Sequence, residues 1–216
     1  MIDVQHTYKL SPYADEGFRK SDYLGEEMSQ KSLSKLETDT ILSSPPTDHV
    51  LGLLSAHIAH ILRSLCGNET DLLNCLPSLE PSVRHDTIFT NNPDPLFKRI
   101  FAFLQLILAY SGGTVSESLY AIYLIEKLAF SDLRPTSKHP GQIVHAQTAG
   151  TLIICAYVLS IKTLRDRPLP NAWWMKVFGI QGKVLESSEL AFLSRLEFDT
   201  HISQENFDRL TIHFLS

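Results

Sequence analysis

The stretch TLIICAYVLSIK, residues 151–162, carries almost no charge before its last position, and it decides the fold class. A helix that is apolar on all sides is buried, either in a protein core or in a membrane. The apolar run is shorter than the ~20 residues that a membrane span needs, and Lys162 ends it. We therefore predict a helix over residues 141–163 that forms the centre of a folded domain.

Helical patterns also fill most of the sequence on either side of this stretch. Apolar residues recur three and four positions apart, and segments rich in Gly, Pro and Asn separate the runs. Thr114 and Glu117 have the spacing of a capping box. Further helices are predicted over residues 48–65, 96–110, 114–130, 171–177, 185–196 and 203–214, with residues 68–94 irregular. Because no alternating strand pattern of any length occurs, the predicted fold class is all-α, with neighbours wrapped around the central helix.

The composition narrows the classes of function. The chain has 216 residues, a net charge of −5 and an apolar fraction of 44%, as in an ordinary globular protein. The acidic balance and the lack of Lys- or Arg-rich blocks argue against a nucleic-acid surface. Three cysteines without a CxxC pair argue against a disulfide framework or a structural zinc.

The N-terminal part differs in character from the rest. Residues 1–47 are polar, and we predict a weakly ordered extension there, followed by one domain over residues 48–216. The first twenty residues have no apolar core, so they do not read as a signal peptide. We therefore expect a protein of the cytoplasm, the nucleus or both, without a membrane partner.

Two histidines and a later His-Asp pair raise the question of an enzyme. His57 and His60 share one helix face, and His85-Asp86 follows, a pattern similar to that of metal-dependent phosphohydrolases. The His-Asp pair falls in the proline-containing irregular segment, where no helix aims both side chains at one metal. GxSxG, HExxH and Walker motifs do not occur. We therefore predict a binding protein rather than an enzyme.

The segment NAWWMKVFGI, residues 171–180, places two tryptophans side by side. Adjacent residues on a helix point about 100° apart, so one groove cannot bury both rings. We expect one indole to fill the core against the central helix. The other indole is expected to cover a neighbouring helix or the rim, where its N–H can reach a partner or water.

The segment from Lys162 to Thr200 resembles the cyclin box, and within it the Pho80-like group, also called P- or U-type cyclins. In that group a lysine and a short loop precede N-A-aromatic-aromatic-x-K-V-G-G, and L-N-x-x-E-x-x-F-L follows. Lys162 lies nine residues before Asn171, and NAWW, KV and Gly179 then match in order. Glu189 begins ELAFL, which fits E-x-x-F-L.

The resemblance is specific over residues 159–200 and looser over 50–202. Phe178 replaces one glycine of the pattern, and Glu186 stands where asparagine is usual. Thr151 occupies the place of a basic residue at the start of the central helix. We expect these departures to change how side chains pack locally, and not the overall resemblance.

What the resemblance implies is a cyclin-box bundle of five helices around a central helix, with extra N-terminal and C-terminal helices. It implies a non-catalytic regulatory subunit that binds and activates a cyclin-dependent protein kinase, in cell-cycle or nutrient and phosphate signalling. Such a kinase has a regulatory helix whose glutamate must pair with the catalytic lysine, and a cyclin holds that helix inward. No cofactor, metal or nucleic acid is implied.

The resemblance also indicates which residues bind the kinase. Lys162 and Glu189 match a charged pair that bonds to backbone groups beside the kinase helix. The positions that match the family's other contacts are Leu159, Thr163, Leu193, Phe198 and Thr200. Among these, Leu193 and Phe198 are expected to supply most of the apolar area.

Two alternatives stay open. A cyclin-fold adaptor or scaffold would bind a partner other than a kinase. Transcription factors of this fold use two repeats or a basic face, and a single box with a net charge of −5 disfavours that version. A helical metal-dependent phosphohydrolase that uses the histidines is the less favoured alternative.

Overall fold

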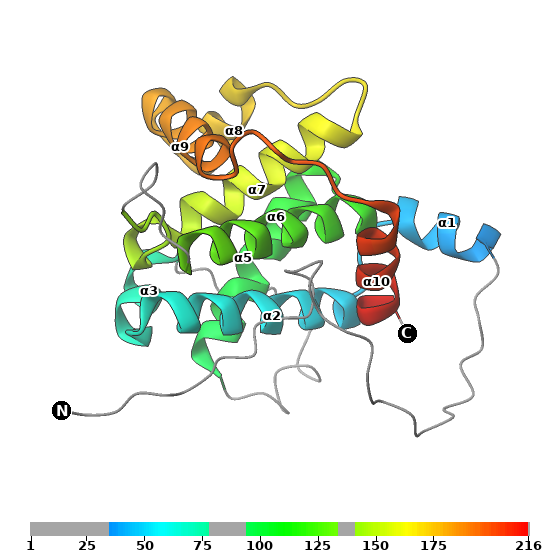
Figure 1. Ribbon diagram of the computed structural model, residues 1–216, viewed down its shortest axis with the longest axis horizontal. Helices are drawn as coiled ribbons and strands as arrows, with labels where there is room; N and C mark the ends of the chain where they lie inside the picture. Colours follow the sequence, from blue (N-terminus) through cyan, green and yellow to red (C-terminus); the bar gives the residue numbers. More distant parts are fainter. Residues whose placement is uncertain (1–34, 78–93, 134–140, 216) are drawn as a thin grey trace. The chain divides into compact units, whose positions relative to one another are not determined.

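A computed structural model describes residues 35–77, 94–133 and 141–215 of the protein. Within these residues the chain forms nine α-helices and no strand, which confirms the predicted all-α class (Figure 1). In chain order the elements are α1 (Lys35–Ser43), α2 (Asp48–Cys66), α3 (Glu69–Cys75), α5 (Pro95–Ser111), α6 (Val115–Leu133), the 3-10 helix η2 (Ala146–Thr148), α7 (Ala149–Leu164), α8 (Asn171–Phe178), α9 (Gly182–Arg195) and α10 (Gln204–Leu215).

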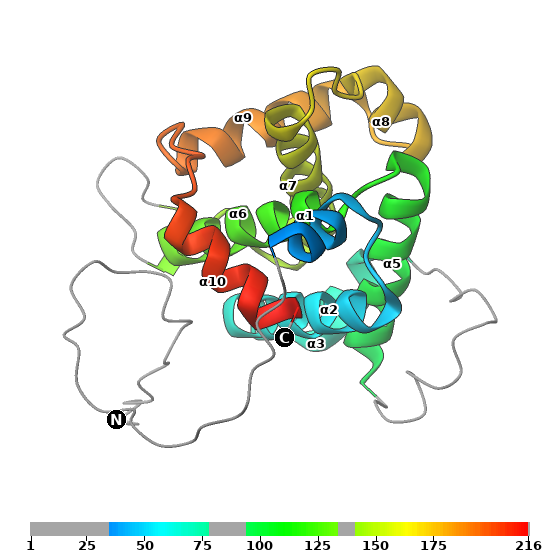
Figure 2. The same cartoon turned by 90° about the vertical axis from the view of Figure 1, so that its right-hand side faces the viewer.

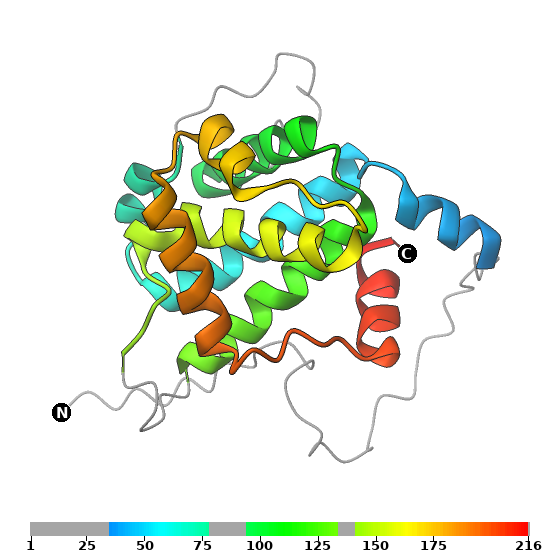
Figure 3. The ribbon, with the colours of Figure 1, turned by 90° about the horizontal axis from the view of Figure 1, so that it is seen from above.

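The helix α7 is the central element, as the apolar stretch predicts. Every residue from Leu152 to Ile161 is buried. The helices α8 and α9 lie on one side of α7, and α2 and α3 lie on the other, in two perpendicular views (Figures 1 and 2). The helix α9 runs across α7 and reaches the end of α6 (Figure 3). The central helix therefore lies between the α8–α9 layer and the α2–α3 layer.

The central helix begins later than predicted, at Ala149 rather than at residue 141. The buried carboxylate of Asp132 accepts hydrogen bonds from the amides of Ile143 and Val144, at 2.9 and 2.6 Å. Arg195 forms an ion pair with the same carboxylate, at 3.2 Å. These contacts with distant parts of the chain hold residues 141–145 outside the helix.

Local capping chemistry sets most of the other helix ends. Thr47 caps α2, and Gly67 ends it in the left-handed conformation at φ 66°. Gly112 ends α5 in the same way at φ 61°. The predicted capping box is confirmed, since Thr114 and Glu117 exchange hydrogen bonds between side chain and backbone.

Two helices lie in segments that the sequence predicts to be irregular or weakly ordered. The short helix α3 lies within the segment predicted to be irregular, and Asn68 caps its start. The helix α1 lies within the polar N-terminal extension, and its end is joined to α6. The hydroxyl of Ser116 donates to Leu42 O at 2.6 Å, and the amide of Val115 donates to Ser44 O at 2.9 Å. Residues 1–34 of that extension lie outside the described residues.

The two tryptophans of α8 have different environments. Trp174 is fully buried and stacks on Phe178, with ring centroids 5.7 Å apart. Its indole N–H has no hydrogen-bond partner among the described residues. Trp173 is half-buried and meets Trp174 edge-on at 5.1 Å. One ring thus belongs to the core and the other to the rim, as the sequence predicts.

Two stretches are long and apolar enough to span a membrane by length and composition alone. They are Asp48–Cys66, the helix α2, and Ala146–Leu164, which joins η2 to α7. In the fold, α2 packs on α5 and α6, and α7 packs on α6 and α9. The apolar side chains of both stretches therefore supply much of the core.

Candidate functional site

A charged pair joins the end of α7 to the middle of α9. Lys162 Nζ lies 2.5 Å from Glu189 Oε1. The side chain of Glu189 is 14% exposed and that of Lys162 is 32% exposed. The pair is thus partly desolvated, but the ammonium group still has solvent-facing hydrogen-bond capacity.

A third helix contributes to the same pair. Asn171, the first residue of α8, donates from Nδ2 to Glu189 Oε2 at 3.0 Å. Both carboxylate oxygens of Glu189 are therefore hydrogen-bonded, one to α7 and one to α8. Lys162, Asn171 and Glu189 lie on three different helices. The hydrogen bonds to the carboxylate therefore fix the positions of these helices relative to one another.

Glu189 also contributes to the raised pKa of the buried Cys155 thiol. Cys155 lies on α7 with no exposed surface. Burial, aided by the negative charge of Glu189, raises the pKa of Cys155 to about 12. The thiol is therefore neutral at physiological pH and acts as a small apolar core residue.

A second ion pair anchors the same end of α7. Arg165 donates from Nε and Nη2 to the two carboxylate oxygens of Glu117, at 2.5 and 2.8 Å. It also donates to the carbonyl oxygens of Ser111 and Gly112, each at 3.1 Å. The hydrogen bond to Glu117 raises the pKa of Arg165 further above its ordinary value. This network fixes the end of α7, and with it the backbone that carries Lys162.

The chain leaves α9 through a turn that exposes an aromatic ring. Glu197 and Phe198 both have left-handed backbone angles, with φ 53° and 61°. The amide of Phe198 donates to Leu193 O at 2.8 Å, and that of Glu197 donates to Ser194 O at 3.0 Å. These are the two hydrogen bonds of a Schellman motif, which usually contains glycine. Phe198 is 63% exposed.

The predicted contact residues have different environments. Lys162 and Glu189 are in direct contact, and Phe198 and Leu193 are joined through their backbones. Leu159 is only 6% exposed, so it offers a partner little surface. Of the two threonines, Thr163 is exposed on α7, and the half-buried Thr200 follows the turn after α9.

The structure shows an exposed apolar residue on α9 that the sequence did not indicate. Leu190 on α9 is 59% exposed, whereas Leu185, Phe192 and Leu196 face the core. On a helix, residue 190 lies on the same side as residues 186 and 193. A helical-wheel projection of α9 could have singled it out, because it departs from the buried stripe.

Of the two histidines on α2 that the sequence singles out, His57 contacts a carboxylate and an aromatic ring. His57 Nε2 lies 2.6 Å from Glu126 Oε1, and the ring packs edge-on against Phe214. His60 is exposed on the same helix. Within the described ranges no group of three His, Cys, Asp or Glu side chains is placed to hold a metal. His85 and Asp86 lie outside the described residues.

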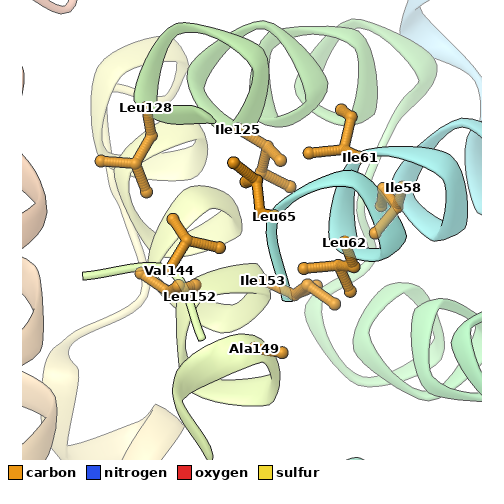
Figure 4. A pocket seen from close by; sticks show the side chains of 10 residues that line it. All are labelled: Ile58, Ile61, Leu62, Leu65, Ile125, Leu128, Val144, Ala149, Leu152 and Ile153. Atoms are coloured by element: carbon orange, nitrogen blue, oxygen red, sulfur yellow. The ribbon is translucent and has the colours of Figure 1, made fainter. Parts of the chain in front are cut away.

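A small apolar pocket lies between α2, α6 and α7 (Figure 4). Aliphatic side chains such as Ile58, Ile125 and Ile153 line it. Its open volume is about 10 Å³, roughly what a single water needs. This pocket is a packing defect of the core and not a ligand site.

No family model matches the sequence, and no curated protein shows significant similarity to it.

Proposed function

We propose that this chain is a regulatory cyclin subunit, with a cyclin-box fold, that binds and activates a cyclin-dependent protein kinase. The observation that carries the proposal is the Lys162–Glu189 pair, which bridges α7 and α9, the helix that also carries the exposed Leu190. The all-helical arrangement around α7 is compatible with the proposal.

The charges of the pair support a role at an interface. Glu189 is held by two donors, and Lys162 keeps part of its surface open. Such a pair presents an oriented ammonium group to backbone carbonyl groups of a partner without first having to order its side chain. Oriented charges of this kind chiefly give specificity, and truncating one partner of such a pair costs about 2–5 kcal/mol of binding free energy.

Exposed apolar side chains on α9 and in the turn after it support the same role. Phe198 and Leu190 are large side chains that are more than half exposed. Leu193 lies between them along the chain and is partly exposed. Large apolar residues around a central charged group are typical of the anchors of a protein interface. The kinase's regulatory helix is the proposed occupant, and the pair would contact its backbone.

The test uses the purified chain of residues 1–216 with a panel of purified cyclin-dependent kinase subunits. Binding is measured by interferometry, and activation is measured by phosphorylation of a protein substrate. We expect at least one kinase to bind and gain activity with the wild type, and both effects to be lost in Lys162→Glu and in Glu189→Lys. Glu205→Lys is the matched control, since residue 205 is exposed on α10.

A double charge swap separates an interface role from a structural one. Lys162→Glu combined with Glu189→Lys keeps opposite charges at 162 and 189. If the pair served only the fold, the double variant would regain kinase binding. We expect it to fold and still fail to bind. Binding without activation would instead favour the adaptor alternative, and no binding to any kinase would refute the proposal.

A further inference from the structure

The turn after α9 keeps an unfavourable backbone without glycine. Glu197 and Phe198 both adopt left-handed angles. Left-handed backbone angles are energetically unfavourable for any residue that carries a side chain. Such conformations persist only where surrounding contacts hold them. The strained residue Phe198 is also 63% exposed. The two Schellman hydrogen bonds hold the turn from within, and contacts from α6 hold the residues that follow it.

Three side chains of one face of α6 supply that stabilisation. Tyr120, Tyr123 and Lys127 are spaced three and four residues apart, so they lie along one side of the helix. Tyr120 donates its hydroxyl to Thr200 O at 2.5 Å, and Tyr123 donates to His201 O at 2.8 Å.

The third side chain adds charge. Lys127 Nζ lies 2.7 Å from Asp199 Oδ2 and 5.6 Å from the centre of the Tyr123 ring. Three consecutive residues directly after Phe198 are thereby attached to α6, which is part of the core. We call Tyr120, Tyr123 and Lys127 the α6 clamp.

We propose that the α6 clamp is a positioning device that holds Phe198 ready for the kinase. The inference rests on the proposed function for the identity of the partner. A ring that is ordered before association does not lose conformational freedom on binding, so the clamp raises affinity without touching the kinase. Because a preformed surface docks without rearrangement, part of the effect is expected in the association rate.

The test compares the wild type with Tyr123→Phe, Lys127→Met and the double variant. Both side chains lie at the surface, so the melting temperature should shift by no more than about 4 °C. We expect amide hydrogen exchange of residues 197–202 in the free protein to accelerate about tenfold in the double variant. The dissociation constant for a purified cyclin-dependent kinase subunit should rise about two- to tenfold.

A charge swap provides the rescue. Lys127→Asp alone should mimic the loss of the clamp, and adding Asp199→Lys should restore slow exchange and tight binding. If Lys127 had a purely structural role, the change in amide exchange of residues 197–202 would not be accompanied by a matching change in kinase affinity. Unchanged exchange in the double variant would overturn the proposal, as would faster exchange with unchanged kinase binding.

The two proposals fail in different ways. If the wild type binds no kinase of the panel, the proposed function is refuted and the clamp loses its partner role. The exchange data on the free protein still decide whether the clamp orders the turn. If kinase binding is present and lost in Lys162→Glu, yet unaffected in the double clamp variant, then the clamp alone is refuted.

Discussion

Two charged pairs start from the same end of α7, three residues apart in sequence, and they differ in what surrounds them. Arg165 and Glu117 are enclosed by the turn between α5 and α6, and the Glu117 side chain is 4% exposed. Lys162 is 32% exposed, and Glu189 directly precedes the exposed Leu190 on α9. The residue types and distances are alike, but the surroundings are not.

The difference teaches how to separate a structural pair from a pair available to a partner. Arg165 spends four of its hydrogen bonds within the chain, two on Glu117 and two on backbone carbonyls. The Lys162 side chain donates one hydrogen bond among the described residues, to Glu189. A third pair, Lys127 with Asp199, is more exposed still, with Asp199 at 62%. The expected effect of mutation on stability follows this order of exposure.

The largest effect is expected for Arg165→Met. The change leaves the carboxylate of Glu117 buried without its guanidinium, and breaking a buried pair in this way costs about 3–5 kcal/mol. Urea unfolding followed by circular dichroism measures the loss. A cost below 1 kcal/mol would show that Glu117 reaches water, and the contrast between the two pairs would then disappear.

A smaller loss of stability is expected for Lys162→Met. Glu189 keeps its hydrogen bond from Asn171 and some solvent, so the free energy of unfolding should fall by about 1 kcal/mol. The same urea experiment applies. A loss as large as that of Arg165→Met would mark Lys162 as a second structural anchor and weaken its assignment to the interface.

Replacing Asn171 by alanine tests the orientation of the carboxylate. One hydrogen bond is lost while the ion pair remains, so stability should fall by about 0.5–1.5 kcal/mol. Kinase affinity should fall less than in Lys162→Glu, because the charge of Glu189 is kept. An equal loss of affinity would assign to Asn171 a direct contact with the kinase.

The smallest effect concerns pH. The hydrogen bond from Lys127 lowers the pKa of Asp199 below its ordinary value, despite slight burial. The folded pKa is lowered, so the pair stabilises the fold above the unfolded pKa of about 4, and this contribution disappears as the pH falls through the folded value. For so exposed a pair the contribution is about 0.2–1 kcal/mol. An NMR titration of the Asp199 carboxyl should show its pKa rise in Lys127→Met; an unmoved pKa would remove this pair from the series.

The sequence predicts those parts of the fold that local chemistry determines. The spacing of Thr114 and Glu117 predicts a capping box at the start of a helix, and the structure has that box at the start of α6. The start of α7 could not be predicted in this way. It depends on Asp132, whose carboxylate holds amides eleven and twelve residues further along the chain.

The candidate site shows the same limit. Lys162 and Glu189 were singled out through a family resemblance, and their contact depends on how α7 and α9 pack. Glu117 was predicted as a capping residue, which it is, but its partner Arg165 lies 48 residues away. Nothing in the local sequence marks the left-handed turn at Phe198, because glycine is absent there. Pairings between distant helices supply what propensity and spacing cannot.

The neighbouring indoles of α8 have a spectroscopic consequence. The chain contains two tryptophans, and both lie in this helix, directly after Asn171 and Ala172. Trp174 is shielded from solvent and Trp173 is partly open to it. Intrinsic fluorescence therefore originates from the helix whose first side chain bonds to Glu189, and any event that loosens or tightens α8 changes the emission without an added label.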